Sequence, residues 1–170
     1  MNKRTDFKFG DADITLLGDE LKVGDKAPDF TATKKTLEEF NSKDLDGKIR
    51  IYSVVPSIDT SVCEIQTTKF NQEATNLDED VVVITISNDL PFALDRFCSA
   101  KGIDKVETVS DYKDLDFGMK YGVVMQEFRL LNRSVFVVDR DNTIKHVEYV
   151  HQNTQLPDYK KAIEKAKELV

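Results

Sequence analysis

The chain has 170 residues and a formal net charge of −7, and 40% of its residues are hydrophobic. This length and apolar fraction predict one domain that spans residues 1–170. The acidic balance argues against nucleic acid or an anionic membrane as a partner, since both require clustered Lys and Arg.

The N-terminal residues contain no apolar stretch of the kind that directs secretion, and no segment approaches the roughly 18 apolar residues of a membrane span. A cytoplasmic protein is therefore expected. The sequence contains two cysteines, Cys63 and Cys98, which do not form a Cys-x-x-Cys pair. In a reducing compartment, a disulfide between them would be catalytic or redox-sensing rather than structural.

The first part of the chain is predicted to form an N-terminal β-hairpin. Gly10-Asp11 and Gly18-Asp19 separate short apolar segments, and such pairs favour tight turns between antiparallel strands. A turn cluster at residues 24–30 then leads into a short extended piece, and residues 41–47 are expected to form a polar loop. The segments expected as strands are residues 7–9, 13–17 and 20–23.

Two strands buried on both faces are expected in the middle of the chain. Residues 49–55 and 81–86 are nearly continuous runs of β-branched and other apolar residues, which is typical of such strands. A helix is predicted after each of them. The first helix runs from Thr60 to about Thr75, and the second is capped by Asn88 or Asp89 and ends at Gly102.

The last part of the chain predicts a shorter strand at residues 106–109 and a short helix at residues 112–120. Strands at 134–139 and 143–150 are joined by a tight polar turn, so this pair is antiparallel, and Pro157 opens a terminal helix. Alternation of buried strands and helices, followed by a hairpin and a helix, indicates a layered α/β domain. Its sheet is predicted to be parallel in part and antiparallel at the end.

Cys63 is expected in the first turn of the helix that follows the first buried strand. Pro56 stops that strand, and Asp59, Thr60 and Ser61 are each good N-caps, so this position holds for every choice of cap. Unpaired N–H groups and the helix dipole at this end favour a thiolate, which is the reactive form of cysteine. The alternative is that Cys63 is a small buried hydrophobic residue, as an arbitrary cysteine usually is.

The pattern Pro56-x-x-x-Thr60-x-x-Cys63 resembles the active-site motif of peroxiredoxins. The longer Pro-Ser-Ile-Asp-Thr-x-Val-Cys resembles that of one subfamily, the thiol peroxidases. The similarity spans nearly the whole chain and implies a thioredoxin-like fold, a central mixed β-sheet flanked by helices with an N-terminal β-hairpin. Two later stretches are also similar to that subfamily: Asp89-Leu90-Pro91-Phe92-Ala93 leading to Arg96-Phe97-Cys98, and Arg133-Ser134-Val135-Phe136-Val137-Val138-Asp139.

The resemblance implies roles for the residues around the Cys63 thiolate, which would attack the peroxide. Thr60 would direct its hydroxyl at the peroxide, and Arg133 would pair with the thiolate and donate to the peroxide. Pro56 would shape the loop and shield the thiol. By position alone, Thr60 is equally well explained as an N-cap, Arg133 as a solvated strand-end arginine, and Pro56 as a strand terminator.

Cys98 lies on an apolar helical face beside Phe97, which is typical of a buried inert thiol. Its position matches the resolving cysteine of thiol peroxidases. The resemblance then implies that peroxide converts Cys63 to a sulfenic acid, that Cys98 condenses with it to an intramolecular disulfide, and that thioredoxin reduces the bridge. This cycle needs no bound cofactor. Because a disulfide requires Cα atoms within roughly 4.4–6.8 Å, at least one of the two helix ends is expected to unwind.

A thiol-specific peroxidase that reduces hydrogen peroxide and organic hydroperoxides is therefore the favoured function, and the resemblance implies a homodimer. The alternative is a non-enzymatic redox switch, in which the bridge between the two cysteines reshapes a surface that binds a partner protein. Thr60 and Arg133 favour the enzyme, because a switch does not need donors for peroxide cleavage. No metal site is expected, because His146 and His151 are not at i, i+4 spacing and neither cysteine has a nearby ligand in sequence.

Overall fold

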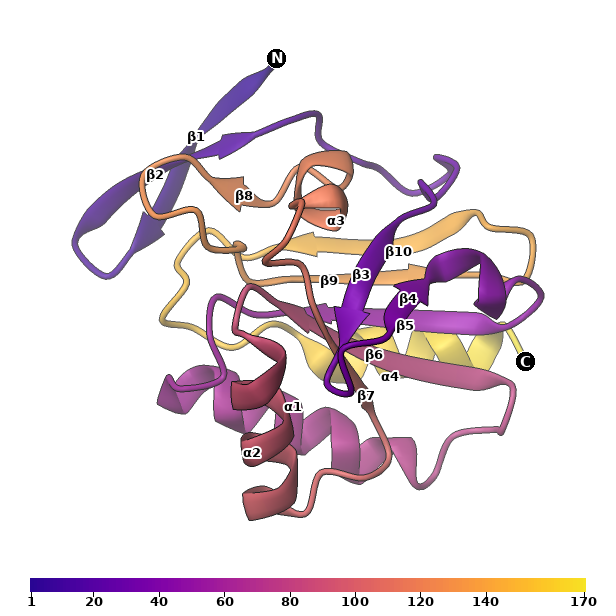
Figure 1. Cartoon of the computed structure of the whole chain (residues 1–170). Coiled ribbons are helices and arrows are strands. Elements are labelled where there is room, and N and C mark those ends of the chain that lie inside the picture. Colours follow the sequence, from indigo (N-terminus) through magenta and orange to yellow (C-terminus); the bar gives the residue numbers. More distant parts are fainter.

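The computed structural model describes residues 1–170 and is built around a seven-stranded mixed sheet with the strand order β10-β9-β5-β6-β7-β3-β4 (Figure 1). Strands β5, β6 and β7 are parallel to one another, whereas β9 is antiparallel to β5 and to β10. The central mixed sheet is therefore confirmed. The strand bounds are β3 (Thr31–Lys34), β4 (Glu39–Asn41), β5 (Ile49–Val54), β6 (Val81–Ser87), β7 (Glu107–Ser110), β9 (Ser134–Val138) and β10 (Ile144–Tyr149).

Helices cover one face of this sheet, and a smaller sheet covers the other (Figure 1). On the first face lie α1 (Ser61–Ala74), α2 (Pro91–Lys101) and α4 (Tyr159–Glu168). On the second face lie the short helix α3 (Asp116–Lys120) and a three-stranded sheet of β1 (Lys3–Phe9), β2 (Ala12–Leu17) and β8 (Val124–Met125). Strands β1 and β2 are the expected N-terminal hairpin.

The alternation of side chains along β5 divides the interior into two cores, because successive residues of a strand point to opposite faces. Ile49 and Ile51 belong to the core beneath α1, α2 and α4, together with both cysteines. Tyr52 and Val54 belong to the other core, which the hairpin and α3 close. All six residues of β5 are buried, as the nearly continuous apolar run predicts, and they include the polar residues Arg50 and Ser53.

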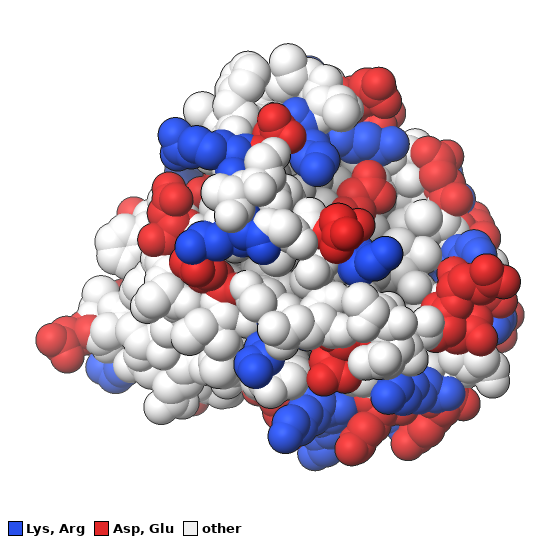
Figure 2. All heavy atoms as spheres, turned by 90° about the horizontal axis from the view of Figure 1, so that it is seen from below, with Lys and Arg blue, Asp and Glu red and all other residues white.

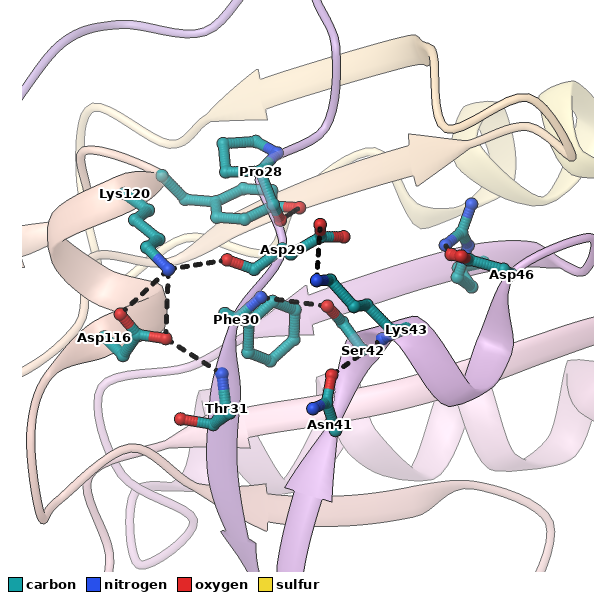
Figure 3. Close-up of polar contacts among 12 residues, drawn as sticks. Pro28, Asp29, Phe30, Thr31, Asn41, Ser42, Lys43, Asp46, Asp116 and Lys120 are labelled. Carbon is teal, nitrogen blue, oxygen red and sulfur yellow. Dashed lines mark hydrogen bonds and ion pairs between the residues drawn. The ribbon is translucent and has the colours of Figure 1, made fainter.

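Polar contacts hold the chain before β3 against α3 and the short 3-10 helix η1 (Ser42–Leu45), as Figure 3 shows. The Thr31 amide donates to Asp116 at 2.8 Å, and the Phe30 amide donates to the Ser42 hydroxyl at 2.9 Å. Lys120 donates to the Asp29 carbonyl at 2.7 Å. These bonds satisfy the backbone on both sides of Phe30, whose ring is buried among aromatic neighbours in the core that does not contain the cysteines.

Several local predictions were wrong. Residues 20–23 form no strand, because the second strand of the hairpin pairs with β8 instead. The predicted helix at 112–120 begins only at Asp116, and the predicted loop at 41–47 contains η1. Strands β4 and β8 are three and two residues long. Such short strands form through tertiary pairing, which a local pattern does not reveal.

The surface carries charges of both signs. On the face seen from below, Lys and Arg lie interspersed with Asp and Glu and do not gather into a broad basic area (Figure 2). No helix of the structure has the length and apolar character needed to cross a membrane.

Candidate active site

The first turn of α1 is formed as the sequence predicts. Strand β5 ends at Val54, and the buried Pro56 lies in the loop that follows. Among the candidate caps, Thr60 is the N-cap: its backbone is extended, with φ −94° and ψ 146°, and its hydroxyl accepts the amide N–H of Cys63 at 3.4 Å. Cys63 therefore lies in the first turn, whereas Ser61 is a residue of the helix and not its cap.

The sulfur of Cys63 contacts the guanidinium of Arg133. Arg133 donates from Nη2 to Cys63 Sγ at 3.1 Å, although the two residues are 70 positions apart in the chain. The pairing of β5 with β9 sets Val54 opposite Ser134, and this brings the residue before β9 to the loop after β5. Sheet pairing thus assembles the thiol and the cation from two distant segments.

Arg133 is buried, with 1% of its surface exposed, and takes part in none of the chain's ion pairs. Its Nη1 donates to Gln66 Oε1 at 2.8 Å and its Nε donates to the Asn153 carbonyl at 3.0 Å. Both acceptors are neutral. A buried cation without a counter-charge is costly, and among the three acceptors of Arg133 only Cys63 Sγ is able to carry a negative charge.

These contacts decide between some of the alternatives. The description of Arg133 as a solvated strand-end arginine was wrong, because the side chain is buried. Cys63 is fully buried, as an inert cysteine would be, but its sulfur accepts a hydrogen bond from a cation. Thr60 acts as an N-cap, and its hydroxyl donates to the Ser57 carbonyl at 3.2 Å. Its role toward a peroxide stays a prediction.

Three further polar residues support the site, and the sequence did not single them out. Gln66 lies one turn after Cys63 on α1, and this spacing was the one available signal. Asn153 accepts the Arg133 amide at 2.7 Å and donates to Asn132 Oδ1 at 2.7 Å. Asn132 and Asn153 come together only through the fold, so no local pattern identifies them.

Cys98 lies in α2 and is buried, with 4% of its surface exposed. Its sulfur is 3.5 Å from the hydroxyl of Thr108 on β7, and its carbonyl accepts the Ile103 amide at 3.0 Å just past the helix end. Cys63 and Cys98 are both free thiols and are not at disulfide distance. A bond between them therefore requires a change of conformation.

A thiol at a helix start, in contact with a buried arginine and directly after a central strand of a thioredoxin-like sheet, defines a class of redox proteins. The redoxin family model matches residues 22–163. The thiol peroxidase of Bacillus subtilis is 54% identical over 162 residues, which are 95% of this chain and 96% of that protein. The thiol peroxidase of Listeria monocytogenes serotype 4b is 55% identical over 163 residues, which are 96% and 98% of the two chains.

Solved structures agree with this assignment. The crystal structure of a peroxiredoxin-like protein from Aquifex aeolicus is 36% identical and superposes with a TM-score of 0.91 over 100% of both chains. The thiol peroxidase from Chromobacterium violaceum is 20% identical, with a TM-score of 0.83 over 94% of this chain and 93% of that chain, and supports the fold alone. The chain belongs to the redoxin family, in its thiol peroxidase group.

Proposed function

We propose that this chain is a thiol-dependent peroxidase that reduces hydrogen peroxide and organic hydroperoxides. The observation that carries the proposal is the 3.1 Å contact between Arg133 Nη2 and Cys63 Sγ at the start of α1. A buried guanidinium without a carboxylate partner favours a thiolate, and the same guanidinium can donate to a peroxide oxygen beside it. The relatives named thiol peroxidase support the same reaction.

In the first step, the Cys63 thiolate attacks one peroxide oxygen. The new S–O bond forms as the O–O bond breaks, and the second oxygen leaves with the electron pair and takes up a proton to become water or an alcohol. Cys63 is left as a sulfenic acid. Arg133 stabilises the charge that builds on the leaving oxygen, the Thr60 hydroxyl turns its proton from the Ser57 carbonyl to the peroxide, and Pro56 keeps the loop closed over the sulfur.

In the second step, the Cys98 sulfur attacks the Cys63 sulfenic acid. An intramolecular disulfide forms and the sulfenic oxygen leaves as water. A dithiol reductant of the thioredoxin type then reduces the bridge by thiol exchange and is itself oxidised to a disulfide. A cytoplasmic location belongs to this proposal, because such reductants keep thiols reduced in that compartment.

The chain acts in this proposal as one domain, since the N-terminal hairpin packs on the same core as β5 and β9.

A homodimer is also proposed. Leu90, Phe92 and Phe128 are large apolar side chains with 52%, 68% and 49% of their surface exposed. Asn88 donates to the Arg129 carbonyl, which joins the start of α2 to the loop after β8. An exposed apolar patch built from such side chains would mark a protein interface. Phe92→Glu is expected to convert dimer to monomer in sedimentation velocity, and a native chain that is already monomeric would contradict the proposal.

The test of the main proposal is peroxide consumption coupled to NADPH oxidation through thioredoxin and its reductase. The native chain should turn over many equivalents of peroxide, and Cys63→Ser should lose this activity. A chain that forms the bridge once, without sustained turnover under reductant, would support the redox switch instead. Both functions form the disulfide, which non-reducing mass analysis in parallel detects. A disulfide with sustained turnover identifies the peroxidase, and a disulfide without turnover identifies the switch.

A further inference from the structure

Asp89 does not have the role that its position suggests. The sequence predicts Asn88 or Asp89 as the N-cap of the second helix, but the N-cap of α2 is Leu90, and no side chain caps this helix. The Asp89 carboxylate instead accepts the Ser57 hydroxyl at 2.8 Å and the Ile58 amide at 2.8 Å. Both donors lie in the loop between Pro56 and Thr60, which leads into the helix of Cys63.

The other contacts of Asp89 fix it to the sheet. Its carboxylate also accepts the Ser87 hydroxyl at 2.8 Å, and its own amide donates to Ser87 Oγ at 3.2 Å. Its carbonyl accepts the hydroxyl of Ser110, the last residue of β7. Asp89 is thus anchored at the ends of β6 and β7 and reaches across to a loop with no regular structure. Hydrogen bonds to a charged carboxylate are stronger than those between neutral groups.

This carboxylate connects the two segments that carry the thiols, and at least one of these segments has to move when the disulfide forms. On one side, residues 57–58 precede the N-cap of the Cys63 helix. On the other side, Asp89 comes directly before α2, whose residue Cys98 is the partner thiol. Since the two thiols are not at disulfide distance, the loop, the helix or both have to leave these positions.

We propose that Asp89 is a positioning residue that holds the Cys63 loop closed against the start of α2, and so sets the balance between peroxide attack and disulfide formation. The proposal rests on the proposed peroxidase function. While the bonds to Ser57 and Ile58 are intact, Thr60 and Arg133 keep their geometry around the Cys63 sulfur. Once they open, Cys63 can approach Cys98.

The chemical consequence concerns the sulfenic acid. While the loop stays closed, a second peroxide can oxidise the sulfenic acid to a sulfinic acid, with release of water or alcohol, and Cys63 is lost from the cycle. Once the loop opens, Cys98 displaces the sulfenic oxygen as water and the disulfide forms. A firmer link therefore favours the first reaction with peroxide and also the damaging second one, whereas a weaker link favours the bridge.

The test compares Asp89→Asn and Ser57→Ala with the native chain in rapid-quench mass spectrometry, which resolves thiol, sulfenic acid, sulfinic acid and disulfide. Both variants should oxidise Cys63 about tenfold more slowly and close the disulfide about tenfold faster, as expected for the loss of a hydrogen bond to a charged group. The sulfinic fraction at a fixed peroxide excess should fall accordingly. Asp158→Ala is the matched control, because Asp158 also accepts a backbone amide, at 3.2 Å, but caps α4. This control should change neither rate.

The outcomes separate a positioning role from a general loss of stability. If Asp89→Asn and Asp158→Ala have the same effect on both rates, or if Ser57→Ala leaves the sulfinic fraction at the native value, the proposal is wrong. In the double variant, Ser57→Ala should add little to the effect of Asp89→Asn, because both substitutions break the same link between the loop and Asp89. Fully additive effects would also overturn the proposal. If Asp89→Asn does not fold, Ser57→Ala decides alone. A native chain without peroxidase activity would reject the proposed function instead.

Discussion

Replacement of Arg133 by Met tests whether the buried guanidinium is what makes Cys63 reactive toward peroxide. Arg133 donates to three acceptors, Cys63 Sγ at 3.1 Å, Gln66 Oε1 at 2.8 Å and the Asn153 carbonyl at 3.0 Å. Methionine fills similar space but has no donor and no charge. The rate constant for Cys63 oxidation should therefore fall about 10²- to 10³-fold, as for the loss of a donor that stabilises a transition state. This is about 3–4 kcal/mol in activation free energy.

The fold should survive this change. The substitution removes a buried cation that has no carboxylate partner, which is favourable, and leaves the acceptors on Gln66 and Asn153 without their donor, at about 1–3 kcal/mol each. These two effects oppose each other, so the free energy of unfolding should change by only a few kcal/mol. Arg133→Lys is the control, since it keeps the charge but cannot reach all three acceptors from one ammonium group. Its rate should lie between those of the native chain and Arg133→Met.

The measurement is rapid-quench alkylation of Cys63 after mixing with peroxide, performed in a Cys98→Ser background so that only the first oxidation is followed. Circular dichroism and urea unfolding confirm that the variants are folded. An Arg133→Met chain that is folded and reacts at the native rate would refute the reasoning. The guanidinium would then be a structural group, and the reactivity of Cys63 would have to come from the helix start alone.

Further predictions concern the bridge, the pH dependence of stability and the backbone. The peroxide-treated native chain should be two hydrogens lighter and run as a monomer on a non-reducing denaturing gel. The Cys98→Ser chain should keep an oxidised Cys63 and form no bridge. A covalent dimer of the native chain would contradict the pairing of Cys63 with Cys98 within one chain. Burial raises the pKa of Asp111 from 3.8 to about 6, so the folded chain binds this proton more tightly than the unfolded chain does. The free energy of unfolding should therefore fall as the pH rises from about 4 to about 6. Asp111→Asn should flatten this slope in urea unfolding, and an unchanged slope would assign it to other groups. Gly122 has φ +66°, and a Cβ at this position would collide with a backbone carbonyl. Gly10 has a similar φ of +64° but open space around it. Gly122→Ala should therefore lower the free energy of unfolding more than Gly10→Ala does.

The position of Cys63 could be predicted because its signals are local. A buried strand, a proline and a group of capping residues follow one another within a few positions, and each narrows the point at which the helix begins. The choice of Thr60 over Asp59 and Ser61 was not predictable, since all three side chains can accept an amide hydrogen bond. The choice did not affect the conclusion, because Cys63 falls in the first turn in each case.

The contact of Cys63 with Arg133 could not be derived from the residues themselves. It depends on β9 pairing with β5, and sequence patterns indicate which segments are strands but not which strands pair. By position alone, a solvated arginine at a strand end was the simpler description. Only the resemblance of residues 133–139 to thiol peroxidases indicated otherwise, and the partners Gln66 and Asn153 had no such signal.

Asp89 illustrates a different limit. An aspartate just before a helix is expected to cap it, and propensity alone favours that choice. In the structure, the carboxylate accepts tertiary donors from the Ser57 loop, together with the neighbouring Ser87 hydroxyl, and does not accept the amides at the start of α2. The amides at the start of α2 are left without a side-chain cap as a result. Local rules fail here at a residue that connects two functional segments, where such exceptions are expected.

The burial of both cysteines links the separate steps of the proposed cycle. Cys63 has 0% and Cys98 has 4% of its surface exposed, and both lie in the core beneath α1 and α2. A peroxide is small enough to enter through a brief opening of the loop, but the partner thiol and a protein reductant both require a larger one. The carboxylate of Asp89 holds that loop, so the larger opening requires its bonds to Ser57 and Ile58 to break, whereas α2 has no side-chain cap that would oppose its movement. The closed site therefore favours the first oxidation, while the disulfide and its reduction depend on the local opening of these same segments.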